Sequence, residues 1–319
     1  MWKKVALGVF GVVALLVVGV VVYFYALHPK VATPRDLKAP STPEAIERGR
    51  YLAEHLLGCV ACHSEIDESR PGDFIKEDTR LSGRVFPQDP DFPGTLVGPN
   101  LTPDPETGLG AWTDGEIVRA IREGISRDGT PLFPIMNYPA YRMLPDEDVL
   151  AVVAYLRTAR PIRRELPRSK VDFPVSMFIR LAPKPVEGSP PPLPTETLPR
   201  GRALLQLMSC KDCHTPMEKG EFVEGKEMAG GMCFKGDFGK VCAPNISSHP
   251  AAGIGSMSDD DLMRVFREGR GKDGRTLWVM PWSVTKGATD EDLRALIAAL
   301  REIPPQTDLV PARELKAGL

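Results

Sequence analysis

The chain has 319 residues, of which 42% are hydrophobic, and its 40 Lys and Arg against 42 Asp and Glu give a formal net charge of −2. This composition excludes a disordered chain, and the lack of a basic excess argues against a nucleic-acid-binding protein. The 32 prolines and 29 glycines predict much loop between short helices. The length is sufficient for two domains of ordinary size.

The first predicted element is a membrane helix. Two lysines precede an unbroken apolar run, Val5–Leu27, which as a helix would span about 34 Å, enough to cross the hydrocarbon core of a bilayer. Because the run ends in the aromatic residues Tyr23–Tyr25 and no small-residue cleavage site follows, residues 1–27 are predicted to be an uncleaved transmembrane anchor. A cleaved signal peptide is the alternative. The polar, Pro-rich residues 28–43 are predicted to form a tether.

The rest of the chain contains an internal duplication. The sequence CVACH at 59–63 recurs as CKDCH at 210–214, and residues 99–129 match 244–274 with twelve of 31 positions identical. The duplication predicts four parts: unit one (44–162), a Pro-rich linker (163–198), unit two (199–304) and a C-terminal tail (305–319). Within the linker, Phe173–Leu181 is apolar and is expected to pack on a domain.

Each unit is predicted to be mainly helical. A helix over Pro43–Gly58 leads into the first Cys pair, and capping boxes at Thr113 and Ser258 start matched helices. The acidic triplets 146–148 and 290–292 start the last helix of each unit, where the macrodipole favours negative charge. A loop-rich unit of this size has a weak core unless something large and apolar fills it.

The two Cys-x-x-Cys-His motifs indicate such a group. Their spacing allows two thiols to bond covalently to one haem, and the adjacent His then ligates the iron. A redox dithiol would follow a strand in a βαβ pattern, and a zinc site would need a second ligand pair in each unit; the sequence has neither. We therefore predict two covalently bound haem c groups, held by the residues of the two motifs: Cys59, Cys62 and His63 in unit one, and Cys210, Cys213 and His214 in unit two.

A methionine is the predicted sixth iron ligand in each unit. Met136 and Met280 lie at matched places in the repeat, each before the last helix and each followed two residues later by an aromatic residue. Alternative ligands are Met143 in unit one and Met257 or Met263 in unit two, although Met263 is expected to lie within a helix. A Met/His pair raises the reduction potential, as suits a carrier of electrons.

A ligating histidine normally donates its other ring N–H to an acceptor in its surroundings. Pro99 and Pro244 stand at matched places, each followed by an asparagine, Asn100 and Asn245. Their carbonyl oxygens are the predicted acceptors. The alternative is that these residues only shape a turn.

Two cysteines remain outside the motifs, Cys233 and Cys242. An even number of remaining cysteines in an oxidising compartment favours a disulfide. Gly236, Asp237 and Gly239 lie between them, so the segment can turn back as a hairpin. Two free thiols, or ligation of the second iron by one thiolate, are the alternatives.

Four stretches resemble a known family: GRYLAEHLLGCVACHS, NLTPDPETGLGAWTDGEIVRAIREGISRDGTPLFPIMNY and DEDVLAVVAYLR in unit one, and FPVSMFIRL in the linker. The chain resembles membrane-anchored dihaem c-type cytochromes and is most similar to the cytochrome c subunits of membrane-bound alcohol and gluconate dehydrogenases. The resemblance covers about residues 44–304. It implies a mainly α fold of two tandem class I cytochrome c domains behind one N-terminal transmembrane helix.

The resemblance also implies a function. The expected protein is not itself an enzyme but carries electrons between a dehydrogenase or quinol-oxidising complex and a terminal acceptor such as an oxidase. Its single helix would cross the bacterial inner membrane, with the haem domains in the periplasm, because covalent haem attachment follows export. Two enzyme classes are alternatives: a dihaem cytochrome c peroxidase, which needs a displaceable ligand position, and a sulfur-compound-oxidising dihaem enzyme, which could recruit Cys233 or Cys242.

Overall fold

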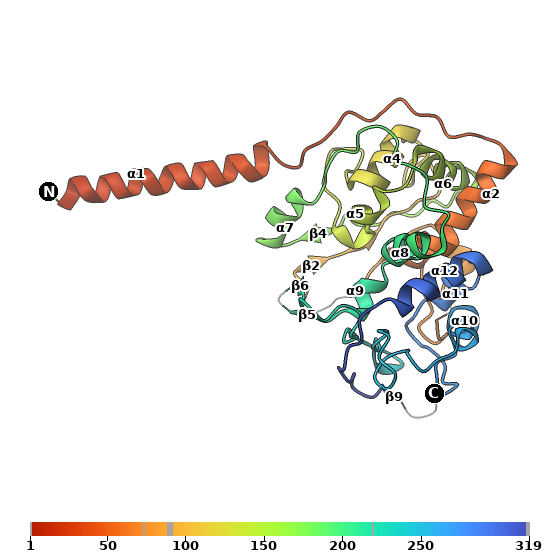
Figure 1. The fold of residues 1–319 in the computed structure, drawn as a ribbon. Coiled ribbons are helices and arrows are strands. Elements are labelled where there is room, and N and C mark those ends of the chain that lie inside the picture. The colour runs from red at the N-terminus through yellow and green to blue at the C-terminus, as the bar shows by residue number, and fades with distance from the viewer. Residues whose placement is uncertain (1, 73, 88–91, 219, 317–319) are drawn as a thin grey trace.

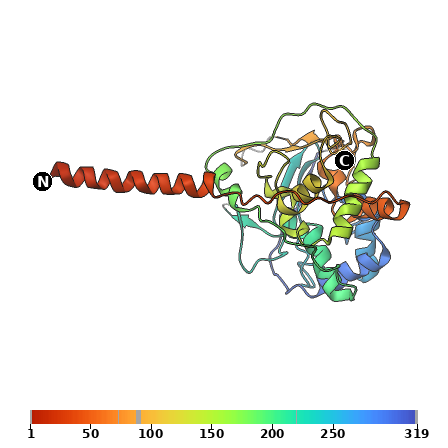
Figure 2. The ribbon, with the colours of Figure 1, turned by 90° about the horizontal axis from the view of Figure 1, so that it is seen from above.

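The computed structural model describes residues 2–72, 74–87, 92–218 and 220–316. Helix α1 (Trp2–Val21), continued by the π-helical turn η1 (Val22–Ala26), projects from a body made of two helical units (Figures 1 and 2). Within the described residues this is the one helix long and apolar enough to cross a membrane, with a mean hydropathy of 3.0. The predicted apolar helix is therefore present.

Unit one is built from short helices around the first Cys-x-x-Cys-His motif. Its helices and helical turns are α2 (Pro43–Tyr51), η2 (Leu52–Leu56), α3 (Cys59–Cys62), η3 (Glu77–Thr79), α4 (Asp114–Glu123), η4 (Pro134–Met136), α5 (Tyr138–Tyr141) and α6 (Asp146–Thr158). The first and last of these helices cross at Gly49, where an added Cβ would come within 1.8 Å of the Ala151 carbonyl oxygen. The Arg48 guanidinium binds the buried Asp148 carboxylate beside this crossing, with an N–O distance of 2.8 Å.

Unit two repeats this arrangement. Its helices are α8 (Thr197–Leu207), α9 (Cys210–His214), α10 (Asp259–Glu268), α11 (Trp282–Thr285) and α12 (Asp290–Arg301). Here α8 and α12 cross at Gly201, where an added Cβ would lie 1.9 Å from the Ala295 carbonyl oxygen. Arg200 binds the buried Asp292 beside it. The same glycine contact and the same ion pair therefore hold the outer helices of both units.

The predicted capping boxes are confirmed. Thr113 and Ser258 cap α4 and α10, each exchanging hydrogen bonds with an acidic residue three positions on. The acidic triplets do begin the last helices, but their role exceeds a dipole effect. Asp146 binds Arg35 at 2.6 Å and the buried Arg122 at 2.9 Å.

In the part of the chain that the structure describes, the strands are short and pair antiparallel. Four ribbons form: β1 (Arg84–Val85) with β3 (Val97–Gly98), β2 (Gly94–Thr95) with β4 (Lys170–Val171), β5 (Met217–Glu218) with β6 (Glu221–Phe222), and β8 (Gly239–Cys242) between β7 (Cys233–Gly236) and β9 (Glu314–Leu315). The β9 pairing returns the C-terminal tail to unit two, where Asn245 also donates to the Gln306 carbonyl at 2.7 Å.

The segment predicted to be a tether instead lies against unit one (Figure 1). Arg35 pairs with Asp146, the Ala39 N–H donates to the Asp114 carboxylate at 2.9 Å, and the Ala32 carbonyl accepts from Arg119 at 3.2 Å. Proline favours the extended backbone that such a strap requires. Composition identified an extended segment but not the side chains that bind it.

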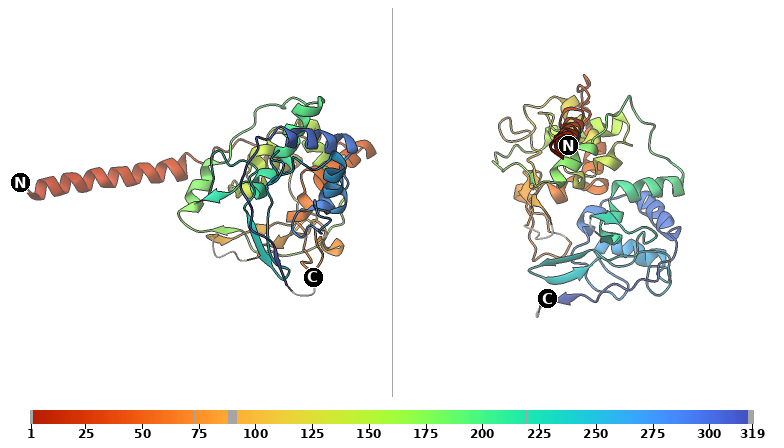
Figure 3. Two further views of the ribbon diagram at one scale, coloured as in Figure 1. Left: turned by 60° about the horizontal axis from the view of Figure 1, so that its bottom comes forward. Right: turned by 90° about the vertical axis from the view of Figure 1, so that its left-hand side faces the viewer.

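The linker also departs from its prediction. Its β4 strand pairs with β2 of unit one, and the apolar segment Phe173–Leu181 forms α7 (Val175–Phe178) and the turn η5 (Ile179–Leu181). This segment packs on the end of the apolar helix, with the Phe24 and Phe178 rings 5.7 Å apart, whereas it was expected to pack on a domain. Seen along α1, the helix stands before unit one, with unit two below it (Figure 3, right).

The two units share one continuous hydrophobic core. Across their boundary the Tyr51 hydroxyl donates to Asp292 at 2.5 Å, and Asn137 donates to the Gln206 carbonyl at 2.9 Å. The His55 ring nitrogen Nδ1 lies 3.0 Å from the Val284 carbonyl oxygen. The units are thus packed together and not merely strung along the chain.

Candidate functional site

Each Cys-x-x-Cys-His motif forms a helical turn directly after the first long helix of its unit. The residues that precede the two cysteine pairs, Gly58 and Ser209, both have left-handed backbone angles, with φ of 63° and 56°. A positive φ is uncommon for a residue with a side chain. The two motifs therefore leave their preceding helices through the same sharp bend.

The histidines of the motifs are oriented in the same way. His63 Nδ1 donates to the Pro99 carbonyl oxygen and His214 Nδ1 donates to the Pro244 carbonyl oxygen, both at 2.7 Å. This bond places the proton on Nδ1 and leaves the lone pair of Nε2 available to a metal. Burial lowers the pKa of His63 to about 4 and also lowers that of His214, so both rings are neutral at neutral pH.

The two asparagines that follow these prolines are buried and brace the loop. Asn100 donates to the Ile162 carbonyl at 2.7 Å, and its Oδ1 accepts the backbone N–H two residues on at 2.9 Å. Asn245 makes the same pair of bonds, with the Gln306 carbonyl at 2.7 Å and the N–H of Ser247 at 2.9 Å. Their structural role is to hold the proline carbonyls in place.

Backbone hydrogen bonds complete the frame around each histidine. The His63 carbonyl accepts from the Gly83 N–H, and the His214 carbonyl accepts from the Gly230 N–H, both at 2.7 Å. The hydroxyl that follows each histidine accepts a further backbone N–H, at 3.0 Å for Ser64 and at 3.1 Å for Thr215. The repeat therefore extends from residue types to individual hydrogen bonds.

The two candidate methionine ligands lie in matched loops. Met136 ends η4 and Met280 precedes α11, and both are half-buried against the core. The aromatic residue that follows two positions later packs on the glycine that ends the preceding helix, since a Cβ on Gly124 or Gly269 would strike the Tyr138 or Trp282 ring. This contact sets the course of both loops.

The alternative methionines lie in other settings. Met257 is buried in the core ahead of α10. Met263 lies within α10, as predicted, and Met143 follows α5, both partly buried against the core.

The thiols of the two motifs are held in apolar surroundings. Burial raises the pKa of Cys59 and of Cys210 to about 12 and that of Cys213 to about 11, and it also raises the pKa of Cys62. A reactive dithiol or a zinc site requires thiolates. In the described part of the chain, moreover, no group of three or more His, Cys, Asp or Glu side chains could hold a metal ion. The setting suits thioether attachment to an apolar group.

Buried polar atoms test whether a haem fits. Among the described residues, the Arg84 Nε, the Arg142 Nε and Nη2 and the Trp282 Nε1 are buried without a hydrogen-bond partner. Arg84 lies close enough to the Cys62 thiol to act on its pKa. Buried N–H donors without a partner need an acceptor, and a haem carries two carboxylates on its edge. The residues present therefore fit the group.

Sequence reasoning missed these three side chains. The duplication could not reveal Arg84. Arg84 follows Gly83, and the residue that follows the matched Gly230 in unit two is a glycine, Gly231. Trp282 was noted only as the aromatic residue after Met280. A single arginine in a two-residue strand or at a helix end carries no periodic signal that tells a buried side chain from a solvated one.

The remaining cysteines face each other on a hairpin. Cys233 and Cys242 are paired residues of β7 and β8, and their sulfurs are bonded at 1.95 Å. Two bonded sulfurs leave no free thiolate, which the alternative of thiolate ligation would require.

The two motifs lie near each other at the boundary between the units. The Asn137 side chain of unit one donates to the carbonyls of Gln206 and Leu207, just ahead of the second motif, at 2.9 and 3.4 Å. The Tyr141 hydroxyl in turn donates to the Leu57 carbonyl at 2.9 Å, just ahead of the first motif.

Comparison with known proteins supports this chemistry. The family model described as "Cytochrome c" matches residues 46–160, which is nearly all of unit one. The fructose dehydrogenase cytochrome subunit of Gluconobacter japonicus is 31% identical over 293 residues, 88% of this chain and 56% of that subunit. The cytochrome c subunit of the quinone-dependent alcohol dehydrogenase of Gluconacetobacter polyoxogenes is 29% identical, over 83% of this chain and 58% of its own.

The chain thus spans only somewhat more than half the length of these two relatives. A protein of Cereibacter sphaeroides named "Diheme cytochrome c-type" is closer in size, with 30% identity over 77% of this chain and 82% of its own. The motif histidines are neutral and lie beside paired thiols, and the unpartnered N–H donors suit haem carboxylates. Both features agree with these matches. The chain accordingly belongs to the c-type cytochromes, electron-transfer proteins that carry covalently bound haem c.

Proposed function

We propose that the chain is a dihaem cytochrome in which each unit is a class I cytochrome c domain. The observation that carries this proposal is the shared frame of the two motifs, with His63–Pro99 and His214–Pro244 bonds of equal length. The proposed domains are residues 44–162 and 199–304. The proposed attachment sites are Cys59 and Cys62 in the first domain, and Cys210 and Cys213 in the second.

In each domain His and Met are the proposed axial ligands. His63 and His214 offer Nε2 because Nδ1 is already engaged, and Met136 and Met280 lie in loops held by the aromatic–glycine contact. Bound haem c would supply reversible one-electron chemistry. The protein holds the ligands and shields the site from water. The methionine thioether, as an iron ligand, favours the reduced state.

The proposed role is to pass electrons from a dehydrogenase or a quinol-oxidising complex to a terminal acceptor such as an oxidase. Relatives named as cytochrome subunits of fructose and alcohol dehydrogenases support the dehydrogenase partner. The contacts of Asn137 and Tyr141 with the residues just ahead of the two motifs support exchange between the motifs within one chain.

The proposed location is the periplasmic face of the inner membrane. The segment Trp2–Ala26 would cross once, with Lys3 and Lys4 in the cytoplasm and both domains outside. A reporter that is active only in the cytoplasm, fused after Leu319, should be inactive. An active fusion would reverse the topology.

The haem count is the direct test. Intact mass and a haem assay of the purified chain should give two haems, and Cys62→Ala and Cys213→Ala should each weaken attachment of one haem and lower the yield of folded protein. A count of one, or peroxide turnover by the purified chain, would contradict the proposal. Purification in mild detergent should recover a dehydrogenase with the chain, and recovery of an oxidase alone would place it elsewhere in the electron path.

A further inference from the structure

The linker segment Phe173–Leu181 presents aromatic side chains to the outside. Phe173 is 74% exposed and Phe178 is 53% exposed. Single exposed apolar residues are ordinary on protein surfaces. These two, however, lie on one short segment beside the apolar helix, Phe173 in the turn before α7 and Phe178 at the end of α7, where further apolar side chains join them.

The segment is bound to the end of that helix. The Phe178 ring meets the Phe24 ring edge-on. The Arg180 guanidinium donates to the Phe24 carbonyl at 2.6 Å and to the His28 carbonyl at 2.7 Å, and it lies 4.9 Å from the centre of the Tyr25 ring. Arg180 thereby closes the helix end, where carbonyl groups lack helical partners.

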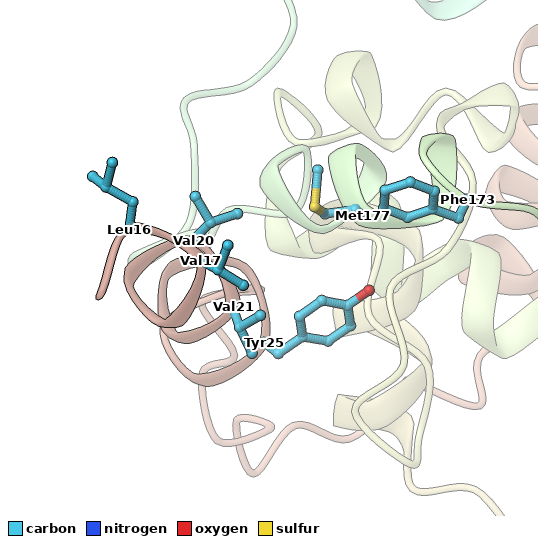
Figure 4. A pocket seen from close by; sticks show the side chains of 7 residues that line it. All are labelled: Leu16, Val17, Val20, Val21, Tyr25, Phe173 and Met177. Carbon is cyan, nitrogen blue, oxygen red and sulfur yellow. The ribbon is translucent and has the colours of Figure 1, made fainter. Parts of the chain in front are cut away.

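Between the segment and the helix lies an apolar groove of about 500 Å³ (Figure 4). Phe173 and Met177 form one wall, and side chains from Leu16 to Tyr25 form the other. At 1.5 Å per residue the second wall runs about 13 Å along the helix. The linker segment therefore reaches back beside the last turns of the apolar span and does not stop at its end.

Unit one holds the segment in this position. Lys170 and Val171 pair with Thr95 and Gly94 in the β2–β4 ribbon, and the Asp172 N–H donates to the Pro93 carbonyl at 2.9 Å. The ribbon ends immediately before Phe173. If the aromatic residues bind to a surface, the ribbon therefore also sets the orientation of unit one relative to that surface.

We propose that Phe173–Leu181 is a second membrane contact, which inserts into the lipid interface while acyl chains fill the groove. The occupant is a lipid because one wall belongs to the helix proposed to cross the bilayer, so the groove is continuous with the hydrocarbon region. Exposed lysines around the segment, Lys30, Lys170 and Lys184, suit phosphate headgroups. Aromatic residues at the interface and apolar helical faces in its plane are both common membrane contacts.

The inference rests on the proposed membrane crossing, and it adds that unit one is the unit held against the bilayer. Unit two carries no comparable bond to the apolar helix among the described contacts.

Spin labels on the full chain in phospholipid bilayers test this inference. The native cysteines are assigned to haem attachment or to the disulfide. A spin label should therefore react only with the cysteine that is introduced. Phe173→Cys is the test position, Leu7→Cys in α1 the lipid control, and Leu309→Cys, which replaces an 85% exposed leucine in the tail, the water control. The measurement is the ratio of collision rates with oxygen and with a water-soluble nickel chelate.

The label at position 173 should give a high oxygen-to-nickel ratio, close to that at position 7 and several-fold above that at position 309. A ratio at 173 equal to that at 309, with 7 still in lipid, would overturn the second contact and leave the anchor intact. Water-like ratios at both 7 and 173 would overturn the anchor and the inference together. Unchanged haem spectra of all three variants will show that the domains are folded.

Discussion

The two units share an internal frame and differ in nearly everything attached to it. Both cross their outer helices at a glycine, both pair an arginine with a buried aspartate beside that crossing, and both bind the histidine of the motif to a proline carbonyl. Around unit one lie the strap, the linker and the apolar helix, whereas unit two has a disulfide hairpin and the returning tail. The interior thus carries the shared chemistry and the periphery distinguishes the units.

One turn shows that geometry, and not residue identity, is repeated. Asp104 in unit one accepts backbone N–H groups two and three residues on, at 3.2 and 2.7 Å. At the matched place in unit two, His249 accepts the same two N–H groups through Nδ1, at 3.2 and 3.0 Å. A carboxylate and an imidazole serve the same turn, so identity between the repeats understates their structural likeness.

The helix crossing should give the largest effect if the shared frame is real. Gly49→Val and Gly201→Val should each abolish stable folding of their own unit, because the new side chain meets a carbonyl oxygen in a fixed backbone. Haem incorporation per unit and resistance to protease measure the result. Gly11→Val is the matched control, since a Cβ there meets no described atom within 4 Å. Normal haem loading of a crossing variant would show that the two crossings are not essential.

Replacing the thioether should distinguish the two units electrochemically. Met136→His and Met280→His should each lower one reduction potential by tenths of a volt and leave the other near its original value. Axial ligation as a whole spans about 0.8 V. A redox titration followed by absorbance measures both. Met143→Leu and Met263→Leu are the controls. A shift in either control, with none in the first two variants, would reassign the ligand.

The hairpin disulfide should affect unit two alone. Cys233→Ser with Cys242→Ser should destabilise that unit by about 2–3 kcal/mol, as expected for a short closed loop, and leave unit one unchanged. Denaturant unfolding with and without reductant measures the difference, and the double variant should not respond to reductant. Alkylation of both cysteines in the unreduced native chain would refute the bond.

The smallest effect is expected at Arg84, which has no equivalent in unit two. Arg84→Gln should lower the reduction potential of unit one by less than Met136→His does. The oxidised haem carries one more positive charge than the reduced haem, so removing a nearby cation stabilises the oxidised state. Arg84→Lys should retain most of the original value. Arg168→Gln, at an 87% exposed side chain, is the surface control. Equal shifts from Arg84→Gln and Arg168→Gln would show that burial at Arg84 does not matter.

Features that depend on near neighbours in the chain could be predicted from the sequence. The Cys-x-x-Cys-His spacing, the capping boxes at Thr113 and Ser258, and the apolar run of the first helix each involve residues within a turn or a few turns of one another. The duplication added longer comparisons, since a motif in one unit predicted its partner in the other. It thereby pointed to Pro99 and Pro244.

Contacts between groups far apart in the chain could not be predicted and became known from the fold. The pair Arg35–Asp146 joins residues 111 positions apart, and Arg180 reaches back 152 positions to the His28 carbonyl. Such contacts leave no period and no local composition in the sequence, because one partner can be any residue that the fold brings within reach. For the same reason the unpartnered nitrogens of Arg84 and Arg142 became visible only once the surrounding chain had enclosed them.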